Sequence, residues 1–537
     1  MGSLDHAPQH SAEDTKRFVD AGYWSDDTLI TYLERWVREA PDRAAIIAGD
    51  RTLTYVELRD AARRFANALL EIGVEKGDVV GVQLPNVPEF IIAHMGLAMM
   101  GGIIGTLHMP YRAGELAPLM SHGRMKALIC GAPTERYDAP ATAFALKAEV
   151  PTLEHVIVLG DPVPVGCHSL TTMIEGGADD PIDWTPGPDD PTVLCFTSGT
   201  AAAPKAVLST YRRIISNALV YGPTIGLSSD DVVMLVPPFT HVFGLLVTDF
   251  TICAGATNLL IDLFTPDALV QRIRHGRPSM VFCAPAHLAA TLKSGLLDSH
   301  DCSSIRDVIT GGALCPPSIA AAFERHLPNG RTGQLFGMTE VLLITQTPPD
   351  SGPEVRHHSA GRALDGLELR ITGEDGNPLP AGAEGALEVR GYTVLAGYLD
   401  NDEADREGFT GDGWFRSGDL ATIDADGNVA ITGRVKDVIN RGGIKINPTD
   451  IENLVTAHES VVQAAVVPEP DDVLGERCCL FVELIPGASL SLGDATAWLE
   501  AKGVAKLRWP ERLVTVDEMP MTPTRKILKG ELVKRLG

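Results

Sequence analysis

The amino-acid sequence predicts an α/β fold, in which a large N-terminal domain of layered α/β sheets is joined by a hinge to a small α+β C-terminal domain. Three observations predict this fold class. The chain has 537 residues, of which 45% are hydrophobic, enough for a large core and for more than one domain. Helical and strand patterns alternate along the first part of the chain. The residues after 434 then form a separate, shorter series of such patterns.

The alternation is clearest between residues 54 and 109. Apolar residues recur at helical spacing over 54–70, and a short apolar run over 78–84 predicts a buried strand ended by Pro85. A second helix is predicted over 88–100. The apolar stretch 91–109 is interrupted by glycines and histidines, so it favours a buried helix followed by a strand over a membrane span.

Strand patterns become more frequent later in the chain, at residues 367–372, 385–390 and 429–431. A polar, charged segment at 433–437 then separates two folded blocks. We therefore expect an N-terminal domain over residues 1–433 and a mobile C-terminal domain over residues 434–537.

The C-terminal block begins with a helix that has a capping box, with Thr449 at the cap and Glu452 three positions on. The patterns that follow it are a strand at 461–467, a strand at 478–484, a helix near 490–502 and a strand at 513–516. A helix among strands of this kind predicts a compact α+β unit.

Composition excludes some classes of function. The formal net charge of −25 repels phosphate backbones and anionic surfaces, so we expect no nucleic-acid partner. The N-terminus has no apolar signal core, and we expect no membrane span. Nine cysteines without a CxxC pair indicate reduced thiols rather than disulfides or a zinc site, which predicts a cytoplasmic protein.

The strongest local pattern is the stretch TSGTAAAPKA at residues 197–206, which follows a buried-strand run at 192–196. Hydroxyls, small residues and a lysine after a strand suit a loop that wraps phosphates. The stretch is not a Walker A loop, because Pro204 and Ala206 stand where that motif has Gly and Ser or Thr. An ordinary polar turn is the alternative.

Two further patterns could bind a nucleotide. In QLFGMTE at 334–340, Phe336 could stack on a base, Thr339 could bond a phosphate and Glu340 could hold Mg²⁺. In WFRSGD at 414–419, Asp419 could bind a ribose diol. Taken alone, the pattern favours a solvated aspartate in a turn over a ribose-binding residue.

The last two patterns are cationic. Arg434 and Lys436 belong to the segment GRVKD at 433–437, and Lys526 ends the segment PTRK near the C-terminus. A terminal lysine is usually a solvated charge, so neither pattern is informative alone.

In this order and spacing the five patterns resemble the superfamily of acyl-CoA synthetases, peptide-synthetase adenylation domains and firefly-type luciferases. The resemblance extends from about Trp24 to Leu536. It implies a large N-terminal domain and a small mobile C-terminal domain, with the active site between them and ATP, Mg²⁺ and coenzyme A as cofactors.

The resemblance also implies roles for individual residues. Thr339 would contact the α-phosphate, Glu340 would ligate Mg²⁺, and Lys526 would be the adenylation lysine. These three residues and Thr200 form the implied catalytic set. The implied cofactor-binding residues are Thr197, Ser198, Gly199, Thr200, Lys205, Gly311, Gly312, Ala313, Phe336, Gly337, Thr339, Asp419, Arg434, Lys436, Gly442 and Gly443.

Within that set, the resemblance assigns ATP binding and thiol binding to different parts of the chain. Thr197 to Lys205 would be the phosphate loop, and Asp419 would hold the ribose hydroxyls. Lys436 falls at the hinge about which the C-terminal domain would rotate. Gly442 and Gly443 fall where the family forms its pantetheine tunnel.

The chain departs from the family in its phosphate loop. The family usually has Gly within the stretch aligned with residues 201–203 and again at Ala206. Alanine restricts the backbone relative to Gly, so a weakly active or inactive acyl-adenylate-binding protein is one alternative. Arg525 also replaces a usual Gly, while Lys526 is retained.

The stretch PPFTHVFG at 237–244 resembles the family segment that begins the acyl pocket. The residues predicted to form this pocket are Phe239, His241, Val242, Ala284, Ala286, Gly312 and Gly337. They are mostly small and apolar, which favours an uncharged hydrophobic acid. His241 has an alternative interpretation as a hydrogen-bonded core histidine.

Stretches at 17–24, 439–443 and 474–478 resemble the siderophore-type aryl acid-AMP ligases. In that branch an Asn follows the pocket histidine and reads a ring hydroxyl, but Val242 stands here. A less polar aryl or alicyclic acid is therefore expected.

We therefore expect an ATP-dependent acid-thiol ligase that forms an acyl-AMP from an aryl, alicyclic or medium-chain acid and then an acyl-CoA. An aryl acid-AMP ligase that loads a carrier protein is the alternative, and dependence on free CoA separates the two.

Overall fold

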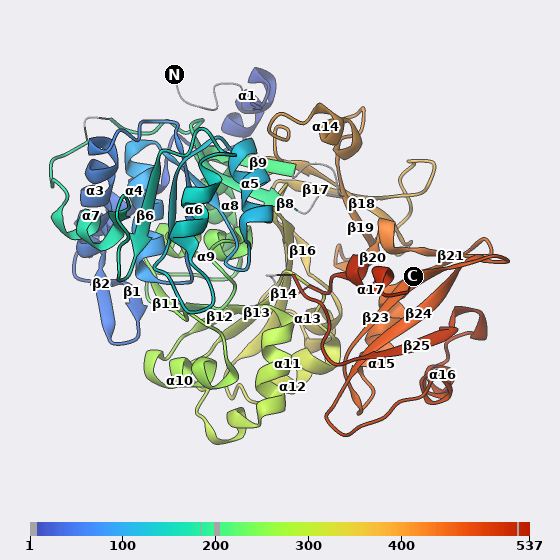
Figure 1. Ribbon diagram of the computed structural model, residues 1–537. Helices are drawn as coiled ribbons and strands as arrows, with labels where there is room; N and C mark the ends of the chain where they lie inside the picture. Colours follow the sequence, from blue (N-terminus) through green and yellow to red (C-terminus); the bar gives the residue numbers. More distant parts are fainter. Residues whose placement is uncertain (1–7, 183, 198–204, 523–525, 537) are drawn as a thin grey trace.

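The computed structural model describes residues 8–182, 184–197, 205–522 and 526–536, and has the expected α/β architecture (Figure 1). Two large sheets and one small sheet belong to the N-terminal domain, and one further sheet belongs to the C-terminal domain. Serine 198, glycine 199 and threonine 200 of the predicted phosphate loop lie outside the described residues, as do residues 201–204.

A nine-stranded sheet has the order β16-β15-β14-β13-β12-β10-β11-β1-β2. Its strands are β1 Ala44–Ala48, β2 Arg51–Thr54, β10 Val232–Leu235, β11 Thr257–Leu260, β12 Met280–Cys283, β13 Asp307–Thr310, β14 Arg331–Met338, β15 Leu342–Gln346 and β16 Arg362–Ala363. The central strands β10 to β14 are parallel and β14 pairs antiparallel with β15, so β14 turns directly into its neighbour.

A seven-stranded sheet has the order β7-β6-β5-β3-β4-β8-β9. Its strands are β3 Val79–Gln83, β4 Ile103–Thr106, β5 Met125–Gly131, β6 His155–Leu159, β7 His168–Ser169, β8 Pro191–Thr197 and β9 Lys205–Thr210. The edge pair β8 and β9 is antiparallel, and the predicted phosphate loop connects these two strands.

Helices of the N-terminal domain cover and separate these sheets. They are α1 Ala12–Asp20, α2 Leu29–Glu39, α3 Tyr55–Glu71, α4 Pro88–Met100, α5 Ala113–His122, α6 Ala139–Leu146, α7 Leu170–Gly176, α8 Tyr211–Thr224, α9 Val242–Ala254, α10 Pro266–Gly276, α11 Pro285–Ser294, α12 Pro317–Glu324, α13 Pro353–His358 and α14 Asp402–Gly408.

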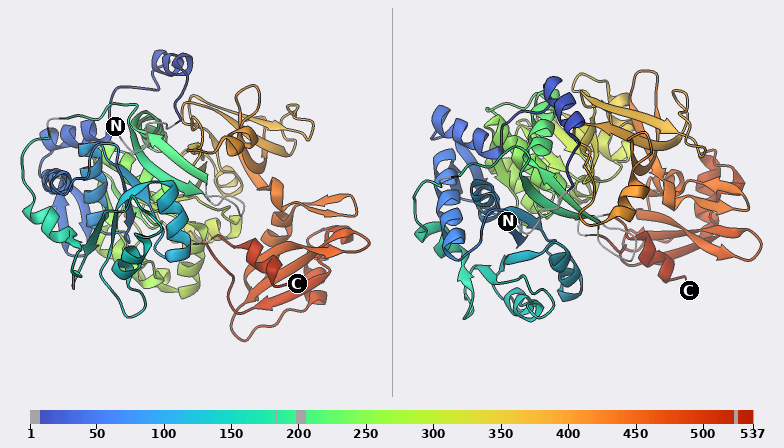
Figure 2. Two further views of the ribbon diagram at one scale, coloured as in Figure 1. Left: turned by 45° about the horizontal axis from the view of Figure 1, so that its top comes forward. Right: turned by 90° about the horizontal axis from the view of Figure 1, so that it is seen from above.

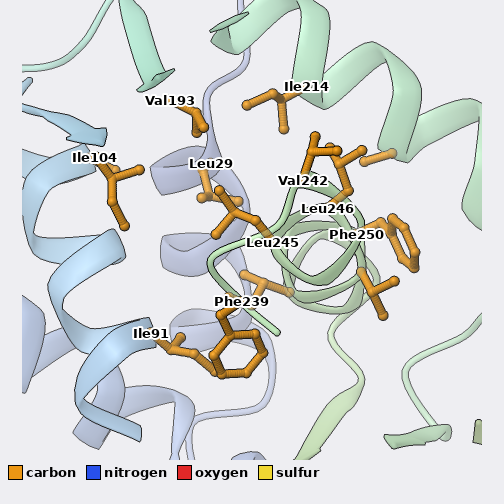
Figure 3. Packing of buried hydrophobic residues seen from close by; sticks show 14 of the residues in the cluster. Leu29, Ile91, Ile104, Val193, Ile214, Phe239, Val242, Leu245, Leu246 and Phe250 are labelled. Atoms are coloured by element: carbon orange, nitrogen blue, oxygen red, sulfur yellow. The ribbon is translucent and has the colours of Figure 1, made fainter. Parts of the chain in front are cut away.

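Helices α4 and α9 are buried along almost their whole length, and one apolar cluster joins them to both large sheets. Figure 3 shows α9 inside this cluster, with Val242, Leu246 and Phe250 along one side of the helix. The start of α9 is therefore held rigidly, which matters because the predicted acyl pocket begins there.

A four-stranded antiparallel sheet completes the N-terminal domain, with the order β17-β18-β19-β20. Its strands are β17 Leu367–Thr372, β18 Gly385–Gly391, β19 Phe415–Ile423 and β20 Val429–Arg434.

The C-terminal domain has its own five-stranded sheet and its own buried clusters, drawn in orange and red in Figure 1. Its elements are β21 Ile439–Arg441, β22 Ile444–Ile446, α15 Pro448–Thr456, β23 Val461–Asp471, β24 Gly475–Leu484, α16 Leu492–Ala501, β25 Arg512–Val516 and α17 Lys529–Lys534. Two further views show this domain beside the larger one (Figure 2). The division at 433/434 stays a prediction.

Most predicted elements are confirmed. The expected helix at 88–100 is α4, the strand at 78–84 is β3, and the apolar stretch 91–109 is a buried helix followed by β4. Among the described residues, no helix has the length and apolarity needed to cross a membrane.

The predicted cap of the C-terminal helix is wrong. Helix α15 begins at Pro448, and the Asn447 side chain accepts the hydrogen bond from the Thr449 N–H. Proline is favoured in the first helical position, which places the cap one residue earlier than Pro448. Glu452 instead accepts a hydrogen bond from the Val466 N–H and lies 2.8 Å from Lys529 Nζ.

Candidate active site

The ends of the phosphate loop are held by strand pairing. Thr197 in β8 is the partner of Lys205 in β9, and Lys205 Nζ lies 3.7 Å from Glu407 Oε2. Ala206 pairs with Phe196 and is fully buried in the regular strand. A strand position needs no glycine, so this departure from the family pattern leaves the described strand intact.

The turn between β14 and β15 presents Thr339 and Glu340. The Glu340 side chain is only 7% exposed, and its Oε1 accepts hydrogen bonds from the Thr197 hydroxyl at 3.2 Å and the Tyr398 hydroxyl at 3.0 Å. Glu340 is therefore pinned to the base of the phosphate loop. Sequence reasoning missed Tyr398, which carries no local signal.

Glu340 also fits a magnesium ion. Mg²⁺ is usually held by one or two carboxylates and by phosphate oxygens, so a single well-placed carboxylate beside a phosphate loop is a suitable donor set. No donor among the described residues reaches Oε2 of Glu340, which leaves that oxygen for a cation. The described residues contain no group of three or more His, Cys, Asp or Glu that could hold a metal without the substrate.

Asp419 fits a hydroxyl-bearing ligand. It pairs across β19 and β20 with Arg434, whose Nε donates to Asp419 Oδ1 at 2.8 Å. The other oxygen, Oδ2, is buried and accepts no hydrogen bond from the described residues. Burial raises the pKa of this carboxyl despite the opposing charges of Arg434 and Lys526. An orphaned buried acceptor is costly, and a ribose diol would satisfy it.

The structure brings Lys526 of the C-terminal domain to these residues of the N-terminal domain. Its pKa is lowered by desolvation and then by Arg434, while Asp419 and Glu340 act in the opposite direction. The backbone N–H of Lys526 donates to the Thr522 hydroxyl at 2.9 Å. Lys526 is an exposed residue on which the charges of Arg434, Asp419 and Glu340 act, and its catalytic role stays a prediction.

His241 lies at the edge of the same group. It caps α9, and its Nδ1 accepts a hydrogen bond from the Phe243 N–H at 3.2 Å, which assigns the ring proton to Nε2. Burial lowers the pKa of His241 to about 3, with smaller contributions from Lys526 and His108. The side chain is therefore a neutral donor at physiological pH.

A second histidine, His108, was not predicted. Its ring lies 6.2 Å from that of His241 at an angle of 20°, and its Nδ1 is 3.1 Å from the Thr240 hydroxyl. Burial lowers the pKa of His108 to about 4. The only sequence signal was a histidine shortly after the buried strand β4.

The other predicted pocket residues lie in different surroundings. Phe239 is fully buried, lies 5.3 Å from the Phe90 ring and is seen beside Ile91 in Figure 3. Val242 begins α9, while Ala284 caps α11 and Ala286 lies in its first turn.

Two of the predicted glycines, Gly311 and Gly337, are required by close packing. A Cβ on Gly311 would lie 2.5 Å from Leu335 Cδ1, and one on Gly337 would lie 2.4 Å from the Leu342 carbonyl oxygen. Gly312 has a φ of +81° and is followed by exposed Ala313. Phe336 is half-buried on β14, immediately before Gly337.

The residues predicted to bind coenzyme A lie elsewhere. Gly442 and Gly443 form the turn between β21 and β22, with φ angles of +58° and +86°. The Gly442 N–H donates to the Leu474 carbonyl at 2.7 Å. Figure 1 labels β21 at the outer edge of the C-terminal sheet, and Lys445 of β22 forms an ion pair with Glu374 of the N-terminal domain. Lys436 is exposed in the 3₁₀ turn Val435–Asp437.

Comparison with known proteins gives a consistent result. Residues 33–399 match the family model of the AMP-binding enzyme, and residues 450–526 match that of the AMP-binding enzyme C-terminal domain. The chain is 36% identical to a salicyl-AMP ligase / salicyl-S-ArCP synthetase of Mycobacterium tuberculosis, covering 100% of this chain and 95% of the relative. It is 32% identical to a salicylyl-CoA synthase / salicylate adenylyltransferase of a Streptomyces species, covering 98% and 96%.

Solved structures share the fold. The ATP-bound MatB of Rhodopseudomonas palustris superposes with a TM-score of 0.85 at 27% identity, covering 95% of this chain and 99% of that one. An anthranilate CoA ligase, AuaEII, solved with anthranoyl-AMP, superposes with a TM-score of 0.88 at 24% identity, covering 95% and 97%.

Proposed function

The chain belongs to the AMP-binding enzyme family, and on this premise we propose that it is an ATP-dependent acid-thiol ligase for a small hydrophobic aryl acid, with coenzyme A as acceptor. The observation that carries the proposal is Asp419, which Arg434 fixes at 2.8 Å, whose other oxygen is buried without a partner among the described residues, and on which the charge of Lys526 acts from the other domain.

The first step would join the acid to AMP. A carboxylate oxygen of the acid attacks the α-phosphorus of ATP, the bond to the β-phosphate breaks, and pyrophosphate leaves. Charge builds on phosphate oxygens, so the protein's task is positioning and cationic stabilisation. Asp419 would hold the ribose and Lys526 would face the developing charge. Magnesium, held by Glu340, would supply further positive charge.

In the second step a thiolate attacks the acyl carbon and AMP leaves. Gly442 and Gly443, at the predicted thiol channel, lie in the turn before Lys445, which pairs with Glu374, whereas the charge of Lys526 acts on Asp419 and Glu340. We therefore propose that the C-terminal domain rotates about Lys436 between the steps, which withdraws Lys526.

The proposed acid is aromatic because the nearer curated relatives described above act on salicylate and the predicted pocket is lined by small apolar residues. Val242 has no hydrogen-bonding group, and neutral His241 offers one N–H donor. A ring acid with few polar substituents matches this lining.

A carrier protein is the second candidate acceptor. It is favoured by the name of the relative at 36% identity, which specifies an ArCP thioester. Coenzyme A is favoured by the relative at 32% identity, whose name specifies a CoA thioester. We place the reaction in the cytoplasm, since all nine cysteines are free.

The test is thioester formation over a panel of benzoate, salicylate, anthranilate, cyclohexanecarboxylate and octanoate, with ATP, Mg²⁺ and either CoA or an aryl carrier protein in its phosphopantetheine form. Products are identified by mass spectrometry. An aroyl-CoA from a benzoate-type acid is expected. A thioester found only on the carrier protein would show that the carrier protein, and not coenzyme A, is the acceptor. If no acid of the panel causes pyrophosphate release, the proposal is contradicted. That result would favour an adenylate-binding protein with an impaired phosphate loop.

A further inference from the structure

Arg213 is a buried cation next to the proposed nucleotide site. It lies in the first turn of α8 and is 2% exposed. Its guanidinium group donates three hydrogen bonds: Nε to the Thr393 carbonyl at 2.6 Å, Nη1 to the Ser209 hydroxyl at 2.7 Å, and Nη2 to the Thr339 carbonyl at 2.9 Å. One side chain therefore joins three segments that are distant in sequence.

Each of these segments also touches the proposed phosphate or magnesium site. Ser209 lies on β9, the strand that begins at Lys205 and returns from the phosphate loop. Thr339 immediately precedes Glu340. The segment after Thr393 binds Glu340 twice, through the Leu395 N–H to its carbonyl oxygen at 2.8 Å and through the Tyr398 hydroxyl to its carboxylate. Arg213 therefore connects the Thr339–Glu340 turn with β9 and with the segment that contains Tyr398.

The charge of Arg213 is unusual for such a place. All three acceptors are neutral, and no carboxylate among the described residues lies within ion-pair distance of it. Burial lowers the pKa of Arg213 to about 10, against the effect of Glu340, so the group stays cationic at neutral pH. A buried unpaired charge is destabilising, and a neutral side chain would hold a core together at lower cost.

The neighbouring Arg212 shows the ordinary arrangement. It is also largely buried, but its guanidinium pairs with Asp189 at 2.6 Å and Asp26 at 3.3 Å and donates to the Ser25 carbonyl. These partners belong to the N-terminal segment and to the loop before β8, away from Glu340. Arg212 is therefore a matched control on the same helix.

We infer that Arg213 is a positioning residue for magnesium-ATP. The three hydrogen bonds of its guanidinium group fix the Thr339–Glu340 turn against β9 and against the segment that contains Tyr398. The inference rests on the proposed function, in which Glu340 holds the metal. Arg213 does not touch the substrate. It acts through the Thr339 carbonyl and through the placement of Tyr398.

The experiment compares Arg213→Met, Arg213→Lys and Arg212→Met with the wild type. ATP affinity is measured by calorimetry across a magnesium titration without any acid, and the melting temperature is measured in parallel. Arg213→Met is expected to raise the magnesium concentration for half-saturation about tenfold, and Arg213→Lys about threefold. Arg212→Met is expected to lower the melting temperature but to leave the magnesium dependence within about twofold of wild type.

An equal loss of melting temperature in Arg213→Met and Arg212→Met, with magnesium dependence unchanged in both, would overturn the inference and make Arg213 a core staple only. If Arg213→Met does not fold, Ser209→Ala decides, because it removes one acceptor and keeps the charge. A shift of about two- to threefold in half-saturation is expected from it, and no shift would overturn the inference.

The acid panel tests the proposed function separately. If the wild type binds ATP in a magnesium-dependent way but activates no acid, the proposed function is contradicted. The Arg213 variants would still test the inference, because their readout is ATP binding. A wild type that binds no ATP would overturn both.

Discussion

The two halves of the proposed site differ in how they are held. Glu340 is buried and fixed by the Thr197 and Tyr398 hydroxyls, with the Arg213 fork behind it. Lys526 is on a short segment of the other domain, and its Nζ makes no hydrogen bond with the described residues, although it senses the charges of Asp419 and Glu340. Glu340 is therefore fixed within the N-terminal domain, whereas Lys526 reaches the site from the C-terminal domain.

This difference fits a reaction in two steps. A fixed carboxylate suits a metal and nucleotide site that serves throughout, because preorganised groups need no rearrangement as charge develops. A lysine held mainly by electrostatic interactions can be withdrawn when the domain moves. The substitutions below remove first the lysine from the C-terminal domain and then the fixed residues of the N-terminal domain, from the largest expected effect to the smallest.

Removing the delivered charge should have the largest effect. Lys526→Ala is expected to lower acid-dependent pyrophosphate release by about 10³-fold, because its ammonium faces the developing phosphate charge. Thioester formation from supplied acyl-AMP should stay near the wild-type rate. Lys534→Ala, an exposed lysine of the same domain, is the control. An equal loss of both half-reactions in Lys526→Ala would refute the division between fixed and delivered groups.

Neutralising the fixed carboxylate should come next. Glu340→Gln keeps the shape of the side chain and its contacts with Thr197 and Tyr398 while removing the charge that holds magnesium. We expect a loss of about 10²-fold in pyrophosphate release at low magnesium and partial recovery at high magnesium. A loss that is independent of magnesium would show that Glu340 has another role.

Asp419 should show its effect in ATP affinity and in its pH dependence. Asp419→Asn is expected to weaken ATP binding about tenfold at neutral pH, since a ribose diol donates best to a charged acceptor. Burial raises the pKa of Asp419, so wild-type affinity should fall as pH decreases through a range above that of an ordinary aspartate. The acidic limb should disappear in Asp419→Asn, and its persistence would assign it to another group.

His241 should have the smallest effect and none on pH dependence. His241→Gln keeps a donor and is expected to lower turnover about threefold. Because the pKa of His241 is about 3, the ring is already neutral between pH 5 and 9, and the shape of the profile should not change. A shift of the acidic limb in this variant would show that His241 titrates during the reaction.

The fold was largely predictable because its signals are local. Helix α4 matches its predicted bounds, since Pro88 starts it and Gly101, with a φ of +72°, ends it. The error at Thr449 was also local, because the chain offers two capping residues within three positions and Pro448 selects the earlier one.

The candidate site could be proposed from the sequence only where a motif carries its residues, and their roles stay predictions. Glu340, Asp419 and Lys526 each stand in a recognisable string and are brought together. Arg213 could not be predicted, because its acceptors Thr339 and Thr393 are 126 and 180 residues away in sequence. The same holds for the contact of His108 with Thr240, which spans 132 residues. Such pairs are defined by how the sheets pack and not by any local pattern.

The most direct test of the central claim is a single-turnover reaction of the wild type with ATP, Mg²⁺ and benzoate in the absence of any thiol, analysed by mass spectrometry. The account predicts one enzyme-bound benzoyl-AMP and one pyrophosphate per active site, both dependent on the acid. Release of ADP and phosphate, or nucleotide cleavage that does not depend on the acid, would contradict it.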